Sequence, residues 1–304
     1  METNYHIPVL LQQSIDGLNI KPNGVYVDAT FGGGGHSREI LKRLDGGRLL
    51  GFDQDEDAEK NAIDDKRFTF VRSNFKYIKN FIRYYEIEKV DGILADLGVS
   101  SHQFDVADRG FSFRFDAPMD MRMNQNGKTS AQQIVNTYGF AQMAEMFRIL
   151  GEVPNAGKLA HAIITARQEK KIETINQFVE SIKICTPQHG ENKYLAQVFQ
   201  ALRMEVNKEI ASLQNFLLQT IGLLKTGGRL SVITYHSLED RLVKNLFKNG
   251  KLEGEVEKDL FGRFEVPFDI INKKIITPDE NEIAANNRAR SAKLRIGERT
   301  NYLN

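Results

Sequence analysis

Short apolar runs in the first third of the chain predict a set of buried β-strands. The runs cover residues 24–28, 48–53, 68–72 and 90–96, and turn-forming residues bound them. Between the runs the apolar positions take helical spacing, as in residues 37–44. Continuous apolar strands that alternate with helices are typical of a parallel sheet covered on both faces. We therefore expect an α/β fold whose ligands bind at the carboxyl ends of the strands.

A fifth apolar run, residues 229–235, lies far beyond the fourth, although a crossover between parallel strands needs only about a dozen residues. The interval is mostly helical in pattern, and Ser130 and Thr174 are candidate N-caps. One apolar stripe steps by three or four from Leu195 to Leu224, which locates the end of the interval only to within several residues. The expected domains are a helical insertion at residues 105–205 and a sheet domain formed by residues 1–104 and 206–304.

Composition narrows the class of protein. A chain of 304 residues with 41% hydrophobic residues is long enough for two packed domains. Because 41 basic residues face 40 acidic ones, a polyanion would have to be held by a local patch. The single cysteine, Cys185, cannot form an internal disulfide or a thiolate cluster. We find no signal-peptide pattern and no apolar run long enough for a membrane span, so we expect a cytoplasmic protein.

Four consecutive glycines, residues 32–35, follow the first predicted strand. Glycine permits positive φ and lets the backbone approach a ligand closely. Asp53 ends the second predicted strand, where a carboxylate can accept hydrogen bonds from the hydroxyls of an adenosyl ribose. Both NAD and S-adenosylmethionine need such an acceptor. Ser37 stands where the pyrophosphate fingerprint GxGxxG has its third glycine, which disfavours a dinucleotide.

Other candidate side chains follow the remaining predicted strands. Asp96 ends the fourth strand and could accept the hydrogens of an exocyclic amine and orient its lone pair, or it could hold only the cofactor. Phe75 follows the third strand and could stack on an adenine ring or lie in the core. His236 and Ser237 follow the fifth strand and could line the acceptor pocket, with helix capping as the alternative for Ser237.

Two segments carry an excess of positive charge. Residues 66–89 hold seven basic and two acidic residues, and residues 286–299 hold five and one. Such patches can neutralise phosphates, although a single patch is more often a solvated face. Arg109 and Arg122 lie close in sequence to Phe111, Phe113 and Phe115, which could pack against an unstacked base. Equally, Arg109, Asp120 and Arg122 could form a structural ion-pair network that links the two domains.

Eight motifs occur in order along nearly the whole chain, and together they resemble the bacterial 16S ribosomal RNA cytosine-N4 methyltransferases. They are HIPVLL at 6–11, VDATFGGGGHS at 27–37, DLGVSS at 96–101, RGFSF at 109–113, PMDMRM at 118–123, FQALRMEVNKEI at 199–210, YHSLEDRLVK at 235–244 and RSAKLRIGER at 290–299. The chain departs from that family in SSHQFD, where SSPQLD is common, and in KYLAQVFQ, where many members have arginine before the phenylalanine. It also lacks the Asp-Pro-Pro-Tyr type of motif of amino-methylating DNA enzymes.

The resemblance implies a Rossmann-like class I methyltransferase sheet with an inserted helical domain that recognises the substrate. It implies S-adenosylmethionine as the cofactor, no required metal, and 16S ribosomal RNA in the small subunit as the partner. The reaction implied is methylation of N4 of a cytidine in the decoding region, cytidine 1402 in that family. The implied cofactor contacts are Gly34, Gly35, His36, Asp53, Phe75, Asp96 and Gln103. The candidate catalytic residues are Asp96, His236 and Ser237, and the candidate RNA contacts are Arg109, Arg114, Asp120, Arg122, Arg290, Lys293 and Arg295.

Two other functions remain open at this point. A nicotinamide-dependent oxidoreductase could use the same glycines and Asp53, although Ser37 argues against it. A ribosome-assembly factor could keep the fold and bind RNA without chemistry, although suitable residues stand at every expected cofactor position. A hydrolase is disfavoured because Ser237 is not part of a GxSxG elbow. The oligomeric state stays undetermined, with a homodimer among the alternatives.

Overall fold

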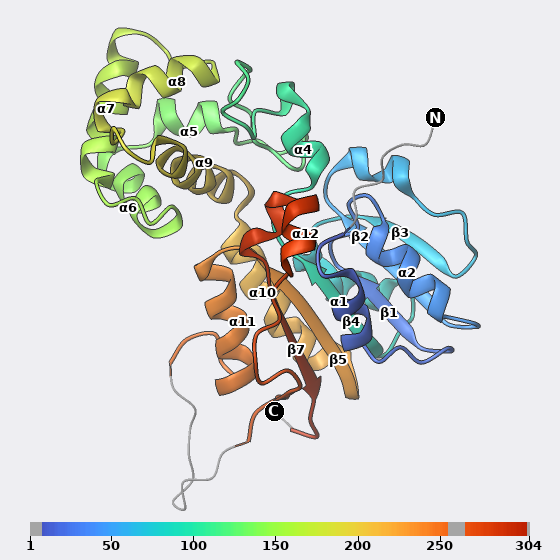
Figure 1. Ribbon diagram of the computed structural model, residues 1–304. Helices are drawn as coiled ribbons and strands as arrows, with labels where there is room; N and C mark the ends of the chain where they lie inside the picture. The colour runs from blue at the N-terminus through green and yellow to red at the C-terminus, as the bar shows by residue number, and fades with distance from the viewer. Residues whose placement is uncertain (1–7, 255–264, 303–304) are drawn as a thin grey trace, which may run out of the picture. The chain divides into compact units, whose positions relative to one another are not determined.

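The computed structural model describes residues 8–254 and 265–302, so His6 and Ile7 of the first motif lie outside the described residues. The chain divides into two compact units (Figure 1). The sheet unit consists of Met1–Gly98 and Ile210–Asn304, and the helical unit consists of Val99–Glu209. The segment 105–205, expected as a helical insertion, lies within the second of these units. No helix in the described ranges is both long enough and apolar enough to cross a membrane.

The sheet unit is built on seven strands in the order β3-β2-β1-β4-β5-β7-β6. The first five are parallel to one another, whereas β7 is antiparallel to β5 and β6 is antiparallel to β7. The strands are β1 Val25–Asp28, β2 Arg48–Asp53, β3 Phe68–Arg72, β4 Val90–Asp96, β5 Leu224–Thr234, β6 Phe268–Ile270 and β7 Lys293–Arg299. The predicted bounds of β2, β3 and β4 are confirmed. The expectation of a purely parallel sheet is wrong at one edge, where β7 and β6 are antiparallel.

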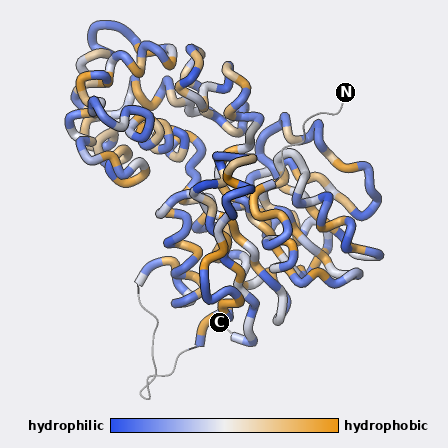
Figure 2. The backbone as a smooth tube through the Cα atoms, in the orientation of Figure 1, coloured by the Kyte–Doolittle hydropathy of each residue, from blue (hydrophilic) through white to orange (hydrophobic). Residues whose placement is uncertain are grey.

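Helices cover both faces of this sheet, and successive strand residues point to opposite faces. Tyr26 and Leu49 pack with α1 and α2, while Val27 and Leu50 pack with α3, α10 and α11. Figure 2 shows hydrophobic stretches along the strands and mixed hydrophilic and hydrophobic stretches along the helices. The helices of this unit are α1 Leu11–Gly17, α2 Gly35–Arg43, α3 Ile78–Tyr84, α10 Glu209–Leu223, α11 Ser237–Asn249 and α12 Glu280–Ala285, with 3-10 turns η1 Glu56–Asn61, η2 Phe75–Tyr77 and η5 Asn287–Ser291.

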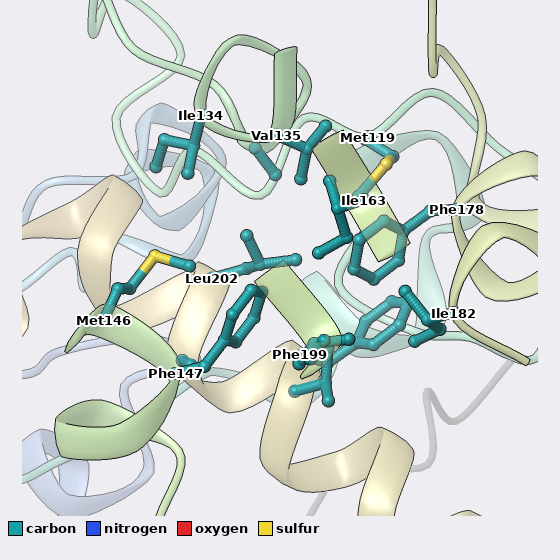
Figure 3. Packing of buried hydrophobic residues seen from close by; sticks show 14 of the residues in the cluster. Met119, Ile134, Val135, Met146, Phe147, Ile163, Phe178, Ile182, Phe199 and Leu202 are labelled. Atoms are coloured by element: carbon teal, nitrogen blue, oxygen red, sulfur yellow. The ribbon is translucent and has the colours of Figure 1, made fainter. Parts of the chain in front are cut away.

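The helical unit has a core of its own. Phe147, Phe178 and Phe199 point toward one another from three helices (Figure 3), and their side chains are 0 to 5% exposed. Ser130 and Thr174 form capping boxes at the N-termini of α5 and α8, as predicted for helix N-caps. The elements are α4 Ser101–Asp105, η3 Ala107–Arg109, α5 Ala131–Thr137, α6 Phe140–Leu150, α7 Ala156–Glu169, α8 Ile175–Ile182, η4 Lys183–Cys185 and α9 Glu191–Asn207.

The apolar stripe from Leu195 to Leu224 does not belong to one helix. Lys208 adopts a left-handed conformation, with φ of 49°, and separates α9 from α10. Asn207 explains where α9 ends, because its side chain accepts a hydrogen bond from the Met123 backbone N–H and donates one to the Met121 carbonyl. These bonds tie the end of α9 to another segment of the helical unit.

Candidate functional site

The glycine loop between β1 and α2 is anchored by Asp28, a fully buried residue that the sequence analysis did not single out. The Ser37 hydroxyl donates to Asp28 Oδ2 at 2.7 Å, and the Thr30 backbone N–H donates to Oδ1 at 3.1 Å. Burial raises the pKa of Asp28 to about 6, although both hydrogen bonds act in the opposite direction. Asp28 therefore fixes the start of the loop rather than facing a ligand.

The four glycines of the loop fall into two pairs. A Cβ on Gly34 would lie 2.6 Å from the Arg38 side chain, and a Cβ on Gly35 would lie 2.2 Å from Pro8. A Cβ on Gly32 or Gly33 would meet nothing within 4 Å. The second pair therefore lets the start of α2 pack closely, while the first pair leaves open space over the backbone where a flat or charged ligand could approach.

Asp53, at the end of β2, faces this loop. Its Oδ2 accepts the Gly32 backbone N–H at 2.8 Å, and its Oδ1 accepts the Asp55 backbone N–H at 2.8 Å. Burial raises its pKa to about 6, and the two N–H donors lower it. A carboxylate oxygen has two lone pairs, so each oxygen keeps one acceptor position for a ribose hydroxyl. The expected role of Asp53 is compatible with this geometry.

Phe75 combines the two alternatives given for it. Its ring centroid lies 5.1 Å from that of Phe216 on α10 in an edge-on arrangement, and it packs against the core beneath the sheet. Its side chain is nevertheless only partly buried. The ring is held rigidly from one side and keeps an accessible part, which suits stacking against an adenine.

Asp96 lies at the end of β4, directly beside the β1 end of the glycine loop. The Tyr235 hydroxyl donates to Asp96 Oδ1 at 2.8 Å, and the Asp96 backbone N–H donates to the Thr30 hydroxyl at 2.7 Å. Tyr235 was placed at the end of the fifth apolar run and given no role. A signal was present in the sequence: the fifth apolar run ends in an aromatic residue, and the neighbouring strand β4 ends in the carboxylate Asp96.

Opposing influences set the pKa of Asp96. Burial raises its pKa most, the Tyr235 hydrogen bond lowers it, and the nearby carboxylates Asp28, Glu239 and Glu282 raise it, and together these influences give a pKa of about 7. His36 Nδ1 lies 4.0 Å from Asp96 Oδ2, but burial lowers the pKa of His36 to about 4. His36 is therefore neutral at pH 7 and does not form an ion pair with Asp96. Its Nε2 lies 3.3 Å from the Val9 carbonyl oxygen.

His236 and Ser237 are placed differently from one another. His236 is the N-cap of α11, because its Nδ1 accepts the Glu239 backbone N–H at 3.5 Å. Its Nε2 lies 3.0 Å from Glu239 Oε1, and both side chains are at most 10% exposed. Ser237 is the first residue of α11 and is exposed. The helix-capping alternative for Ser237 is therefore wrong, since His236 has that role.

Several candidates lie in the helical unit, where most are already engaged by neighbours. Gln103 is 4% exposed and closes the capping box of α4 with Ser100. Arg109 is 8% exposed, and its guanidinium donates to the carbonyls of Arg122 and Met123. These bonds favour a structural role for Arg109 within its own unit.

Two further candidates of this unit form an ion pair. Arg122 binds Asp120 with two hydrogen bonds of 2.7 Å and also donates to the Gly127 carbonyl. Each side chain of the pair is about one third exposed. Arg114 is exposed, with Phe115 beside it at 47% exposure. Among the basic candidates in this unit, Arg114 is exposed, Arg122 is partly buried and Arg109 is buried.

The basic segment 286–299 also contains both ion-paired and exposed basic residues. Arg295, on β7, donates to both carboxylate oxygens of Asp240 at 2.8 and 3.1 Å, and Lys293 lies 3.9 Å from the same carboxylate. Arg290, in η5, is exposed. Part of the charge excess in this segment therefore holds β7 to α11, and Arg290 remains available for a partner.

The fold and this site together define the class. A mainly parallel doubly wound sheet presents a glycine loop, a ribose-type acceptor at the end of β2 and a second carboxylate at the end of β4. The protein has the Rossmann-like fold of the class I methyltransferases. S-adenosylmethionine is the cofactor of such enzymes. The Asp53 carboxylate suits its ribose hydroxyls and the Phe75 ring suits its adenine, while the open backbone at Gly32 and Gly33 leaves space for the cofactor to approach.

Comparison with known proteins narrows the class to a family. The model of the MraW methylase family matches residues 3–300, and the chain belongs to this family, which confirms the resemblance seen in the motifs. The chain is 59% identical over 299 residues to ribosomal RNA small subunit methyltransferase H of Bacteroides fragilis, covering 98% of both chains. It is equally similar, 59% over 299 residues and 98% of both chains, to the enzyme of that name from Bacteroides thetaiotaomicron. Among solved structures, an rRNA methylase from Streptococcus thermophilus is 11% identical with a TM-score of 0.44, covering 97% of this chain and 99% of the other.

Proposed function

We propose that this protein transfers the methyl group of S-adenosylmethionine to the exocyclic N4 of a cytidine in 16S ribosomal RNA, at cytidine 1402. The observation that carries the chemistry is the Asp96 carboxylate, which stands at the sheet edge with one oxygen bound to Tyr235 and the other facing His36 at 4.0 Å. The names of the relatives, which are small-subunit ribosomal RNA methyltransferases, support the choice of substrate.

The chain's own residues divide the work between binding and orientation. The cofactor supplies an electrophilic methyl group on a sulfonium. Asp53 accepts the ribose hydroxyls, Phe75 packs on the adenine, and the glycine loop of residues 32–35, with His36 after it, lies along the remainder. Asp96 accepts a hydrogen bond from the amino group of the base and so orients the nitrogen lone pair toward the methyl group. His236 and Ser237 line the same edge of the sheet.

Methyl transfer from labelled S-adenosylmethionine to small ribosomal subunits that lack the modification tests this proposal directly. Digestion to nucleosides followed by mass spectrometry is expected to find the label in N4-methylcytidine. Label in another nucleoside would refute the acceptor. Cofactor binding in calorimetry without any transfer would favour a protein that binds RNA without chemistry.

Replacement of Asp53 by alanine is expected to weaken S-adenosylmethionine binding by about 1 to 3 kcal/mol, because the ribose hydroxyls lose a charged acceptor. This corresponds to a roughly 5- to 150-fold rise in Kd, measured by isothermal titration calorimetry. Asp64→Ala is a matched control, since that carboxylate is exposed in the loop before β3. An unchanged Kd in the Asp53 variant would exclude this cofactor geometry.

The basic segment 66–89 offers a surface for the RNA on α3. Lys79, Asn80, Arg83 and Tyr84 line a shallow depression, and the Tyr84 ring is 75% exposed. A lysine and an arginine can neutralise phosphates, and an exposed tyrosine can stack on an unpaired base. We assign this depression, together with Arg114 and Arg290, to contact with the RNA.

The double variant Lys79→Ala/Arg83→Ala is expected to bind the small subunit more weakly and with a shallower salt dependence. The slope of log K against log salt should fall by about 1 to 2, because roughly one counterion is released per phosphate contact. Filter binding over a range of salt concentrations measures it. Lys42→Ala/Lys60→Ala removes the same charge from two other exposed lysines of the sheet unit. Equal slopes for the two double variants would show that the depression on α3 does not touch RNA.

A further inference from the structure

We propose that Tyr235 is a positioning residue of the methyl-transfer reaction, which holds the Asp96 carboxylate in one orientation and leaves its second oxygen for the reacting amine. The inference rests on the proposed function of Asp96 and goes beyond it, since it assigns to a neighbouring hydroxyl the task of keeping that carboxylate in place and receptive.

Tyr235 is itself fixed from two sides. Its backbone N–H donates to Glu239 Oε2 at 3.0 Å, which ties the corner between β5 and α11. Its ring lies beside Gly98, where an added Cβ would come within 3.5 Å of the ring. Gly98 has a φ of 106°, a conformation that other residues rarely adopt. The Tyr235 side chain is also partly buried against the cluster that contains Ile233 and Leu294, so its phenol hydroxyl reaches Asp96 Oδ1 from a packed ring.

The carboxylates around Asp96 explain why a hydrogen-bond donor is needed to keep Asp96 ionised. Asp28 approaches from β1, Glu239 from α11 and Glu282 from α12, and each of them disfavours a negative charge on Asp96. His36, on α2, is neutral and adds no positive charge. The Tyr235 hydroxyl is thus a neighbour that favours the charged form, and the charged form is the stronger acceptor for a hydrogen bond from an amine.

A variant without the hydroxyl changes the pH dependence in a defined direction. In Tyr235→Phe, burial and three carboxylates still raise the pKa of Asp96, while the hydrogen bond that lowers it is gone, so the pKa rises above its value of about 7. At pH 7 a larger fraction of Asp96 is then protonated, and in this fraction the carboxyl group is a weaker acceptor for the amine. The acidic limb of the pH profile of kcat should move to higher pH. Turnover should be about tenfold lower than that of the wild type at pH 7 and should mostly recover near pH 9.

The experiment measures kcat and KM for S-adenosylmethionine between pH 6 and 9.5 in the full-length enzyme with small subunits as substrate. Tyr138→Phe is the matched control, because it removes a hydrogen bond of the same kind, from Tyr138 to Glu205 at 2.6 Å, in the helical unit. We expect the limb to shift in Tyr235→Phe alone and KM for the cofactor to change less than about twofold. Site-specific 3-fluorotyrosine at position 235, a stronger donor of nearly the same shape, should move the limb to lower pH and keeps the test valid if the phenylalanine variant does not fold.

The outcomes separate this inference from the function on which it rests. If Asp96→Ala is inactive but both Tyr235 replacements give the wild-type pH profile, Asp96 keeps its role and the inference about Tyr235 is wrong. If Asp96→Ala retains turnover, the proposed role of Asp96 fails first. Opposite shifts of the limb in the phenylalanine and fluorotyrosine proteins support the inference, because a purely structural role for the ring would not give them.

Discussion

Asp96→Ala is expected to lower the turnover of methyl transfer by about 10²- to 10³-fold while the protein stays folded, the magnitude typical for loss of an oriented group that stabilises the transition state. The carboxylate lies between the glycine loop and Tyr235, so its loss removes the acceptor for the amine of the base. Single-turnover measurements with saturating S-adenosylmethionine isolate this step from cofactor binding. Calorimetry on the same variant gives the change in cofactor affinity.

These two measurements also distinguish the two roles that the sequence left open for Asp96. A large loss of turnover with a small change in Kd indicates contact with the base, whereas parallel losses indicate that the carboxylate mainly holds the cofactor. Asp269→Ala, at an exposed carboxylate on β6 of the same sheet, should behave as the wild type. Near wild-type turnover in the Asp96 variant would remove this residue from the site.

Phe178→Ala is expected to destabilise the helical unit by about 3 to 5 kcal/mol, the usual cost of emptying a fully buried aromatic position. Phe178 is 0% exposed, and its ring lies 5.9 Å from that of Phe199 in the cluster shown in Figure 3. Because the buried clusters of the two units share no residue, we expect calorimetry to show a lowered transition for the helical unit and an unchanged one for the sheet unit.

Phe115→Ala is the control for this prediction, because Phe115 belongs to the same unit but is 47% exposed. Its cost should stay below about 0.5 kcal/mol. A single transition that shifts as a whole in Phe178→Ala would mean instead that the two units unfold cooperatively.

Three of the five parallel strands, β2, β3 and β4, could be predicted to the residue, whereas the predicted runs 24–28 and 229–235 only overlap β1 Val25–Asp28 and β5 Leu224–Thr234. β4 is apolar along most of its length, so its bounds follow from composition alone. β7 has a different pattern, in which the buried residues Leu294 and Ile296 alternate with the basic residues Lys293 and Arg295. That alternation is a strand signal, but the charges drew attention to an RNA-binding patch instead. β6 has only three residues, too few for a pattern to show.

The candidate site was predictable where chemistry follows the end of a strand, and less so where a residue acts through a neighbour. Asp53 and Asp96 could be assigned because the carboxyl edge of a parallel sheet is where ligands bind. The roles of Tyr235 and Asp28 could not be assigned, because they depend on a partner from another element, the Asp96 carboxylate of β4 for Tyr235 and the Ser37 hydroxyl of α2 for Asp28. The break at Lys208 was equally hidden, since no glycine or proline marks it.

The insertion of the helical unit between β4 and α10 sets the order in which the two cores can form during synthesis. The core of the helical unit lies between Phe111 and Leu202, so it is complete before β5, which begins at Leu224, has been made. Until then β4 can pair with β1 but lacks its other neighbour. An unpaired apolar strand edge is a template for association between chains. During elongation through the helical unit, the open edge of β4 is therefore exposed to association with other chains.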